Sequence, residues 1–161
     1  GIMRLKAEVI NMIDPVFGRK DPKLDYHTRI GAYGVIPDHS GARLLILQAP
    51  NHALFLPGGG VEEGETPEVT LARELLEEFG ATVHVTQKLG KSSEYFYSHH
   101  RQTAYYHPAT FFACDQLAFV QDPLETFNTL MLMPIDLALA ELKRPTHRWA
   151  VAKWLANQPK R

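Results

Sequence analysis

Three glutamates at positions i, i+3 and i+4 are the side chains of this sequence best suited to chemistry. Glu74, Glu77 and Glu78 belong to the acidic run 59–81, and on a helix this spacing places all three on one face. Like charges this close repel one another and destabilise an isolated helix. A hard divalent cation removes that penalty, because carboxylate oxygens suit Mg²⁺, Mn²⁺ or Ca²⁺. The spacing therefore predicts a cation site.

The flanking residues predict a helix from about Pro67 to Phe79. Thr66 suits the N-cap, and Pro67 falls at the first helical position, where its missing N–H costs nothing. Gly80 ends the helix as a C-terminal cap. The apolar residues cluster nearly opposite the glutamates and comprise Leu71, Ala72, Leu75, Leu76 and Phe79. One face is thus expected to pack into a core while the other presents carboxylates.

Two neighbouring features are expected to shape the site. Arg73 lies four residues before Glu77 and can pair with it, which would orient a metal ligand. Upstream, Pro57 precedes the three glycines 58–60, whose backbone can take unusual angles. A glycine loop beside carboxylates favours a functional metal site over a purely structural Ca²⁺ site, because a structural site would not require such a backbone.

The run resembles the Nudix box, G-x5-E-x7-R-E-U-x-E-E-x-G-U, in which U is a bulky aliphatic residue. The matching positions are Gly59, Glu65, Arg73, Glu74, Leu75, Glu77, Glu78 and Gly80. The single departure is Ala81 at the last U, a small loss of packing volume that does not touch the chemistry. The alternative interpretation, an ordinary amphipathic helix with an acidic surface, does not account for eight matched positions.

The resemblance implies an enzyme that hydrolyses a nucleoside diphosphate linked to another moiety. It implies Mg²⁺ as the cofactor, with Mn²⁺ as the alternative. The implied catalytic and metal-binding residues are Glu74, Glu77 and Glu78, completed by a backbone carbonyl of Gly58 or Gly59. The implied orienting residues are Arg73 and Glu65.

Members of this family often add a carboxylate from a loop outside the box, as a metal ligand or general base. Glu125 is the first choice in this chain, because it follows Asp122-Pro123-Leu124 just before a predicted strand. An ordinary surface carboxylate is an equal alternative for this residue. Glu94 is the second choice.

The segment Glu94–Tyr106 is unusually rich in aromatic and cationic residues. Tyr95, Tyr97 and Arg101 are its predicted substrate-binding residues, because a nucleotide needs a stacking face and a phosphate-binding cation. The alternative is that alternate aromatics simply pack the sheet.

The box itself does not identify the substrate. By family resemblance, dinucleoside polyphosphate hydrolases carry a tyrosine where this chain has Tyr97, whereas ADP-ribose hydrolases carry a proline, which this stretch lacks until Pro108. This favours a dinucleoside polyphosphate. The alternatives are sanitisation of an oxidised or non-standard nucleoside triphosphate, and a non-catalytic nucleotide-binding Nudix module. Such modules usually lose box carboxylates, and this chain keeps all of them.

Composition narrows the class of protein. With 161 residues, 45% of them apolar and 22% charged, the chain is expected to form one soluble domain, 1–161. With a net charge of −1, the chain lacks the excess of positive charge expected of a protein that binds duplex nucleic acid or an anionic membrane. No apolar run is long enough to span a bilayer. One cysteine fits a reducing cytoplasm. The expected partner is a small nucleotide, and either a monomer or a homodimer is compatible.

The remaining pattern predicts an α+β fold with a mixed sheet. Residues 29–36 and 43–48 are predicted to form a hairpin, followed by a short strand at 52–56. Further strands are predicted at 82–89, 94–98, 103–113 and 127–133, and two helices at about 135–142 and 146–156. The Nudix resemblance implies an α/β/α sandwich, which agrees with this order.

Overall fold

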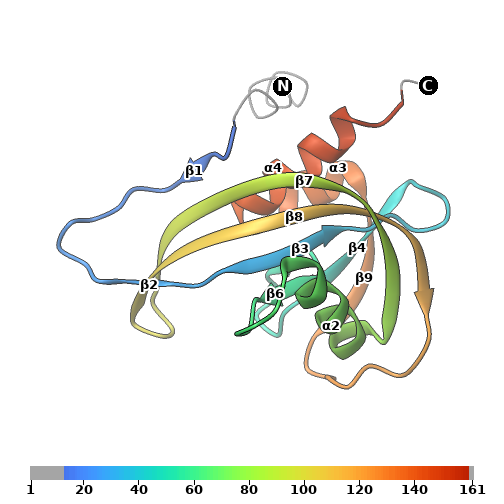
Figure 1. Cartoon of the computed structure of the whole chain (residues 1–161), viewed down its shortest axis with the longest axis horizontal. Helices are drawn as coiled ribbons and strands as arrows, with labels where there is room; N and C mark the ends of the chain where they lie inside the picture. Colours follow the sequence, from blue (N-terminus) through green and yellow to red (C-terminus); the bar gives the residue numbers. More distant parts are fainter. Residues whose placement is uncertain (1–12, 160–161) are drawn as a thin grey trace.

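The computed structural model describes residues 13–159, which form helices on both sides of a long β-hairpin. Figure 1 shows helix α2 on one side of this hairpin and helices α3 and α4 on the other. The bounds of the helices are α2 (Pro67–Phe79), α3 (Ile135–Glu141) and α4 (Pro145–Ala156). The expected α/β/α arrangement is therefore confirmed.

The larger of two sheets is mixed, as predicted. Its strands run in the order β1 (Val16–Phe17), β7 (Ala81–Ser98), β8 (Thr103–Phe119), β3 (Gly31–Val35) and β6 (Gly58–Gly60), with β2 (Tyr26–Thr28) beside β8. The β7–β8 and β3–β6 pairs are antiparallel, whereas β1, β2 and β3 run parallel to their partners β7 and β8.

The smaller sheet corrects one prediction. It consists of β5 (Leu54–Phe55), β4 (Arg43–Gln48) and β9 (Thr129–Pro134), all antiparallel. The predicted hairpin of residues 29–36 with 43–48 is wrong, because β3 pairs with β8 on one edge and β6 on the other. With no free edge on β3, the chain crosses into the second sheet. Two hydrogen bonds remain beside the turn, from the Leu45 N–H to the Ile36 carbonyl and from the Asp38 N–H to the Arg43 carbonyl (2.9 Å each).

Most other elements were predicted close to their observed bounds. The box helix has the predicted bounds, and the two C-terminal helices differ from prediction by about one residue. The strands predicted at 82–89 and 94–98 are instead one strand, β7, with register shifts as far as Gly90. The short strands β1, β2 and β6 were not predicted, because two or three residues carry too little pattern.

Adjacent residues of β8 belong to two different hydrophobic clusters, one on each face of the large sheet. Phe111 and Trp149 belong to the cluster beneath α3 and α4, and Phe112 to the cluster beneath α2. This follows from the two-residue period of a strand. Cys114 is buried in the α2 cluster. Between residues 13 and 159, no helix has both the length and the hydropathy to cross a membrane.

Candidate active site

Helix α2 is fixed at both ends, so its carboxylate face has a defined direction. The Val69 N–H donates to Thr66 Oγ1 (3.2 Å) at the N-terminus, and Gly80 adopts the left-handed conformation (φ 62°) at the C-terminus. Leu71, Leu75 and Phe79 are buried against the large sheet. The three glutamates consequently lie on the other side of the helix, as their spacing predicts.

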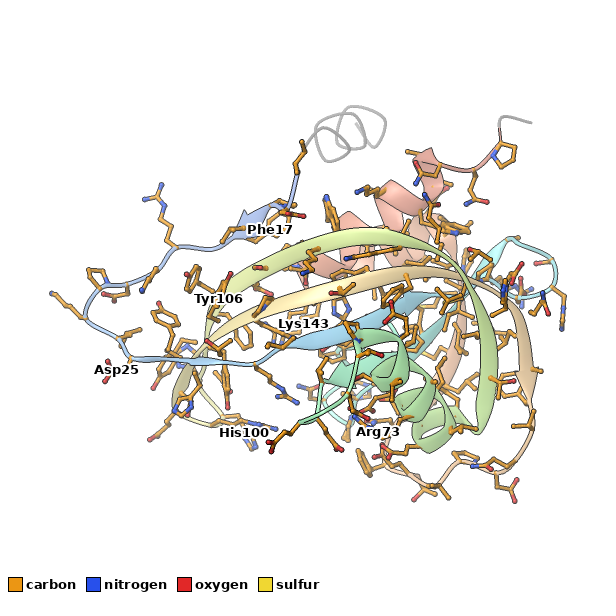
Figure 2. The ribbon with its side chains drawn as sticks, viewed as in Figure 1. Phe17, Asp25, Arg73, His100, Tyr106 and Lys143 are labelled. Atoms are coloured by element: carbon orange, nitrogen blue, oxygen red, sulfur yellow. The ribbon has the colours of Figure 1, made fainter. Side chains whose placement is uncertain are left out.

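Arg73 joins the helix to the loop that precedes it. Its Nε and Nη2 donate to the two carboxylate oxygens of Glu65 at 2.7 and 2.9 Å, and Nη2 also donates to the Gly60 carbonyl (3.1 Å). Its Nη1 donates to Glu74 (3.1 Å) and Glu77 (3.3 Å). Figure 2 shows Arg73 projecting from α2. The predicted pair with Glu77 is present, but Glu65 is the closer partner.

The Arg73–Glu65 pair has a clear electrostatic signature. Hydrogen bonds from Arg73 and from the Glu62 backbone N–H lower the pKa of Glu65 to about 2, so this carboxylate stays ionised. The Glu65 side chain is only 13% exposed. A rigid, bidentate contact of this kind holds the loop in register with the helix.

Glu78 is the box carboxylate in the most unfavourable surroundings for a charge. Burial raises its pKa to about 9, and the neighbouring charge of Glu74 adds to the effect. The Gly58 backbone N–H donates to Glu78 Oε1 (3.2 Å) and partly offsets this. Burial likewise raises the pKa of Glu74. The Glu74 carboxylate packs so closely on Gly59 that a Cβ there would lie 2.6 Å from the carboxylate carbon.

The loop after β8 brings Glu125 to the C-terminal end of α2, the end that carries Glu77 and Glu78. The backbone N–H groups of Leu124 and Glu125 both donate to the Glu77 carbonyl (3.0 Å each). Those of Val120 and Gln121 donate to the Gly80 carbonyl at 2.8 and 3.2 Å. The charge of Glu125 contributes to the raised pKa values of Glu74 and Glu78. Four backbone hydrogen bonds thus dock this loop on the helix terminus, next to the box.

The donor set fits a hard divalent cation. Within residues 13–159, no three His, Cys, Asp or Glu side chains already converge as a ligand group, because Glu74 and Glu77 are turned toward Arg73. Nevertheless, the mutually repelling carboxylates at this site are all hard oxygen donors of the kind that Mg²⁺ or Mn²⁺ requires. Binding would require Glu74 and Glu77 to exchange the guanidinium for the cation.

A pocket of about 250 Å³ has Glu78 in its lining. Gly58 and Gly59, from the glycine strand β6, line it together with Glu78. The remaining lining includes residues that sequence reasoning did not select, namely Arg29, Tyr33, Phe55, Phe96, His107, Arg144 and His147. They come from strands of both sheets, from the segment between β2 and β3 and from the start of α4, so no local pattern joins them.

The structure does not bring the predicted substrate residues of β7 to this pocket. Alternation along the strand places Tyr95 and Tyr97 on the face opposite Phe96. Tyr95 stacks on Tyr106 with ring centroids 4.6 Å apart, and Tyr97 lies beside His99 at 5.0 Å. The alternation was visible in the sequence and would have separated Phe96 from its neighbours.

Two other predicted residues lie away from the carboxylates. Arg101 is exposed in the turn between β7 and β8, next to His100, which Figure 2 labels. Glu94, the second choice for an added carboxylate, has its Oε1 3.8 Å from Arg144 Nη1. Burial raises the pKa of Glu94, and the charge of Arg144 opposes this. Neither residue joins the box glutamates.

Comparison with known proteins agrees with this geometry. The chain is 41% identical over 61 residues to a MutT-like protein from Streptomyces ambofaciens, covering 38% of this chain and 40% of that protein. It is 38% identical over 68 residues to the mitochondrial Nudix hydrolase 18 of Arabidopsis thaliana, covering 42% and 38%. The matched region thus spans about two fifths of the length of these relatives.

Structural similarity and the family model cover much more of the chain. A NUDIX hydrolase from Nitrosomonas europaea superposes with a TM-score of 0.64 at 18% identity, over 81% of this chain and 90% of that one. At this identity the likeness establishes the fold alone. The NUDIX domain model matches residues 25–157. The chain therefore belongs to the Nudix family.

Proposed function

We propose that this protein is a Mg²⁺-dependent pyrophosphohydrolase that cleaves the diphosphate of a nucleotide derivative. The observation that carries the proposal is that Glu78, which shares a helix face with Glu74 and Glu77, lines a pocket that aromatic side chains also line. The carboxylates suit a cation that binds phosphates, and the pocket suits the organic part of the substrate. Mn²⁺ is the alternative cation.

Each residue of the site has a distinct role in this proposal. Bound Mg²⁺ would neutralise charge on the diphosphate and lower the pKa of a coordinated water. Glu74, Glu77 and Glu78 would hold the cation, together with the Gly58 carbonyl. Arg73 and Glu65 keep the glycine strand in register with the helix. Glu125, on the docked loop, accepts the proton of the attacking water.

The substrate is proposed only as a class. The case for a dinucleoside polyphosphate used Tyr97, which lies on the face of β7 away from the pocket. This position removes the argument that Tyr97 supplied, so the proposed class comprises nucleoside di- or triphosphate derivatives, including oxidised or non-standard triphosphates, as well as dinucleoside polyphosphates. Both classes belong in the same substrate panel.

The direct test is turnover of a nucleotide panel with Mg²⁺, read as phosphate or pyrophosphate release and as product mass. The panel comprises nucleoside triphosphates, dinucleoside polyphosphates and nucleotide sugars. We expect Glu78→Gln to remove most activity, and Glu68→Gln, an exposed first-turn position of α2, to retain it. Nucleotide binding without any turnover would instead identify a non-catalytic binding module. An unchanged rate in Glu78→Gln would refute its assignment as a ligand.

A further inference from the structure

A second pocket, of about 480 Å³, adjoins the first along the glycine strand β6. Gly58 and Gly59 line the first pocket, and the next residue of the strand, Gly60, lines the second. Each pocket also has one box carboxylate in its lining, Glu78 in the first and Glu74 in the second. A chain of phosphates bound at these carboxylates would therefore reach both pockets.

Arg29 lines both of these pockets. Its backbone N–H donates to the Tyr106 carbonyl (2.8 Å). The carbonyl of the next residue, Ile30, accepts from the Val61 N–H (2.9 Å), directly after the glycine strand. Arg29 Nε lies 3.9 Å from the point where a Gly60 Cβ would stand. The exposed Arg29 is thus held beside the glycine strand by a backbone that is fixed on two sides.

The guanidinium of Arg29 is available to a ligand. Within residues 13–159 it has no hydrogen-bond or ion-pair partner, whereas the two carboxylates of the second pocket contact Arg73. Glu74 Oε1 lies 3.1 Å from Arg73 Nη1, and Glu62 Oε1 lies 3.6 Å from it. In the first pocket, burial lowers the pKa of His107 to about 4, and the charge of Arg29 adds to this effect. An unpaired guanidinium whose charge acts in the first pocket suits the oxygens of a phosphate.

The second pocket differs from the first in its chemistry. Among the residues that the structure describes, no aromatic ring lines it, whereas Tyr33, Phe55 and Phe96 line the first. A nucleobase draws much of its binding energy from stacking, so the second pocket does not suit a second nucleoside. Thr28 supplies a hydroxyl to it. Glu62, whose side chain is 69% exposed, supplies a carboxylate that lies 3.6 Å from the arginine beside it, beyond hydrogen-bond distance. Such groups pair with the hydroxyls of a sugar.

We propose that the second pocket binds the sugar of a nucleoside diphosphate sugar, and that Arg29 binds the diphosphate that joins this sugar to the nucleoside. The nucleoside then occupies the first pocket, with its aromatic lining, and the phosphates lie at the box carboxylates. The inference rests on the proposed function, because it takes the box as the phosphate site. Within that function it selects a sugar, and not a second nucleoside, as the group attached to the nucleotide.

The test is equilibrium binding in EDTA, so that it does not depend on hydrolysis. Calorimetry would compare ADP, GDP and UDP with the glucose ester of each, so that any base preference cancels within a pair. Gly60→Ala adds a methyl group to the second pocket without a clash, since its nearest neighbours would lie 3.9 Å away. We expect it to weaken the glucose esters roughly 10-fold and the free diphosphates less than about twofold. Arg29→Gln should weaken both members of each pair roughly 10- to 100-fold. Arg43→Gln, an exposed arginine on β4 outside both pockets, should weaken neither.

Four results would overturn the inference. The first is no selective weakening of the glucose esters by Gly60→Ala, and the second is unchanged affinity in Arg29→Gln. The third is tighter binding of diadenosine diphosphate than of ADP-glucose, and the fourth is no measurable binding of any of the six ligands to the wild type. Thermal melting of each variant checks that the fold is retained. Selective binding of the esters without turnover would refute the proposed hydrolysis and leave this inference standing, whereas turnover of other nucleotides together with any of the four results would refute this inference alone.

Discussion

At the scale of single residues, the site is organised around one cation and several carboxylates. Arg73 touches Glu65, Glu74, Glu77 and the Gly60 carbonyl, so it compensates most of the acidic face by itself. Glu78 is outside this network and carries the raised pKa. Glu78 therefore keeps its proton near neutral pH in the metal-free protein, and a cation bound where we propose would displace that proton.

The stability of the metal-free protein should fall with rising pH because of Glu78. Its pKa is about 4.5 when unfolded and about 9 when folded, so between these values the native state holds one more proton. Glu78→Gln should flatten this dependence by at most about 1.4 kcal/mol per pH unit. Urea unfolding at pH 6 to 9 in EDTA measures it. A parallel pH dependence in the variant and wild type would contradict the prediction, with Glu68→Gln as the control.

Replacing Arg73 by lysine should lower both activity and acid tolerance. Lysine cannot reproduce the two-pronged contact with Glu65, so we expect kcat/KM to fall by roughly 10- to 100-fold. The lowered pKa of Glu65 contributes stability that is present above about pH 4.5 and is lost as pH falls through about 2. In Arg73→Lys this loss should begin at higher pH. Acid titration of circular dichroism measures the shift, and Arg43→Lys should leave it unaltered.

At the scale of elements, the C-terminus of α2 is where helix, strand and loop are joined. Gly80 caps the helix, begins the chain path into β7 and accepts two hydrogen bonds from the Glu125 loop. Glu77 supplies its side chain to Arg73 and its carbonyl to the loop. The placement of Glu125 therefore depends on backbone contacts with α2 and not on the side chains of the loop.

Comparing Gly80→Ala with a control variant should distinguish the effect of displacing the Glu125 loop from the effect of backbone strain alone. An alanine Cβ would collide with the Gln121 carbonyl, and the φ of 62° is itself unfavourable for alanine. Gly41→Ala is a matched control, because its φ is 72° and nothing lies within 4 Å of the added Cβ. We expect about 1 kcal/mol of destabilisation in Gly41→Ala and more in Gly80→Ala. Only Gly80→Ala should also lower kcat, as measured by unfolding and turnover.

Sequence reasoning succeeded for elements whose signals are local. Thr66, Pro67 and Gly80 determine the box helix, and all three take the expected positions. It failed for the pairing of 29–36 with 43–48, because strand partners depend on which edges the rest of the sheet has occupied. The break expected between residues 89 and 94 is instead a bulged continuation through Gly90.

The same distinction holds for the site. The carboxylate face and Arg73 follow from helical spacing, and their geometry was predictable. The pocket was not, because Tyr33, Phe96 and Arg144 meet only through the packing of β3, β7 and α4. A stricter use of strand alternation would have selected Phe96 over Tyr95 and Tyr97.

At the scale of the whole molecule, the large sheet carries a separate hydrophobic cluster on each face. Phe111 and Phe112 are adjacent in β8 but belong to different clusters. Phe111→Leu and Phe112→Leu should each cost about 1 kcal/mol. Because the two side chains share no partners, the double variant should be additive within about 0.5 kcal/mol. Chemical denaturation of the four proteins measures this, and a larger coupling would show that the two faces respond as one core.

The reactivity of Cys114 can report local opening of the fold beneath α2. The thiol is buried in the α2 cluster, and burial raises its pKa to about 12, so it is unreactive toward thiol reagents in the closed state. It is also the only cysteine of the chain. The rate at which a thiol reagent modifies Cys114 therefore measures how often the structure beneath α2 opens. A nucleotide or cation that tightens α2 would slow that rate, and its binding could be followed in this way without a label or a substrate turnover assay.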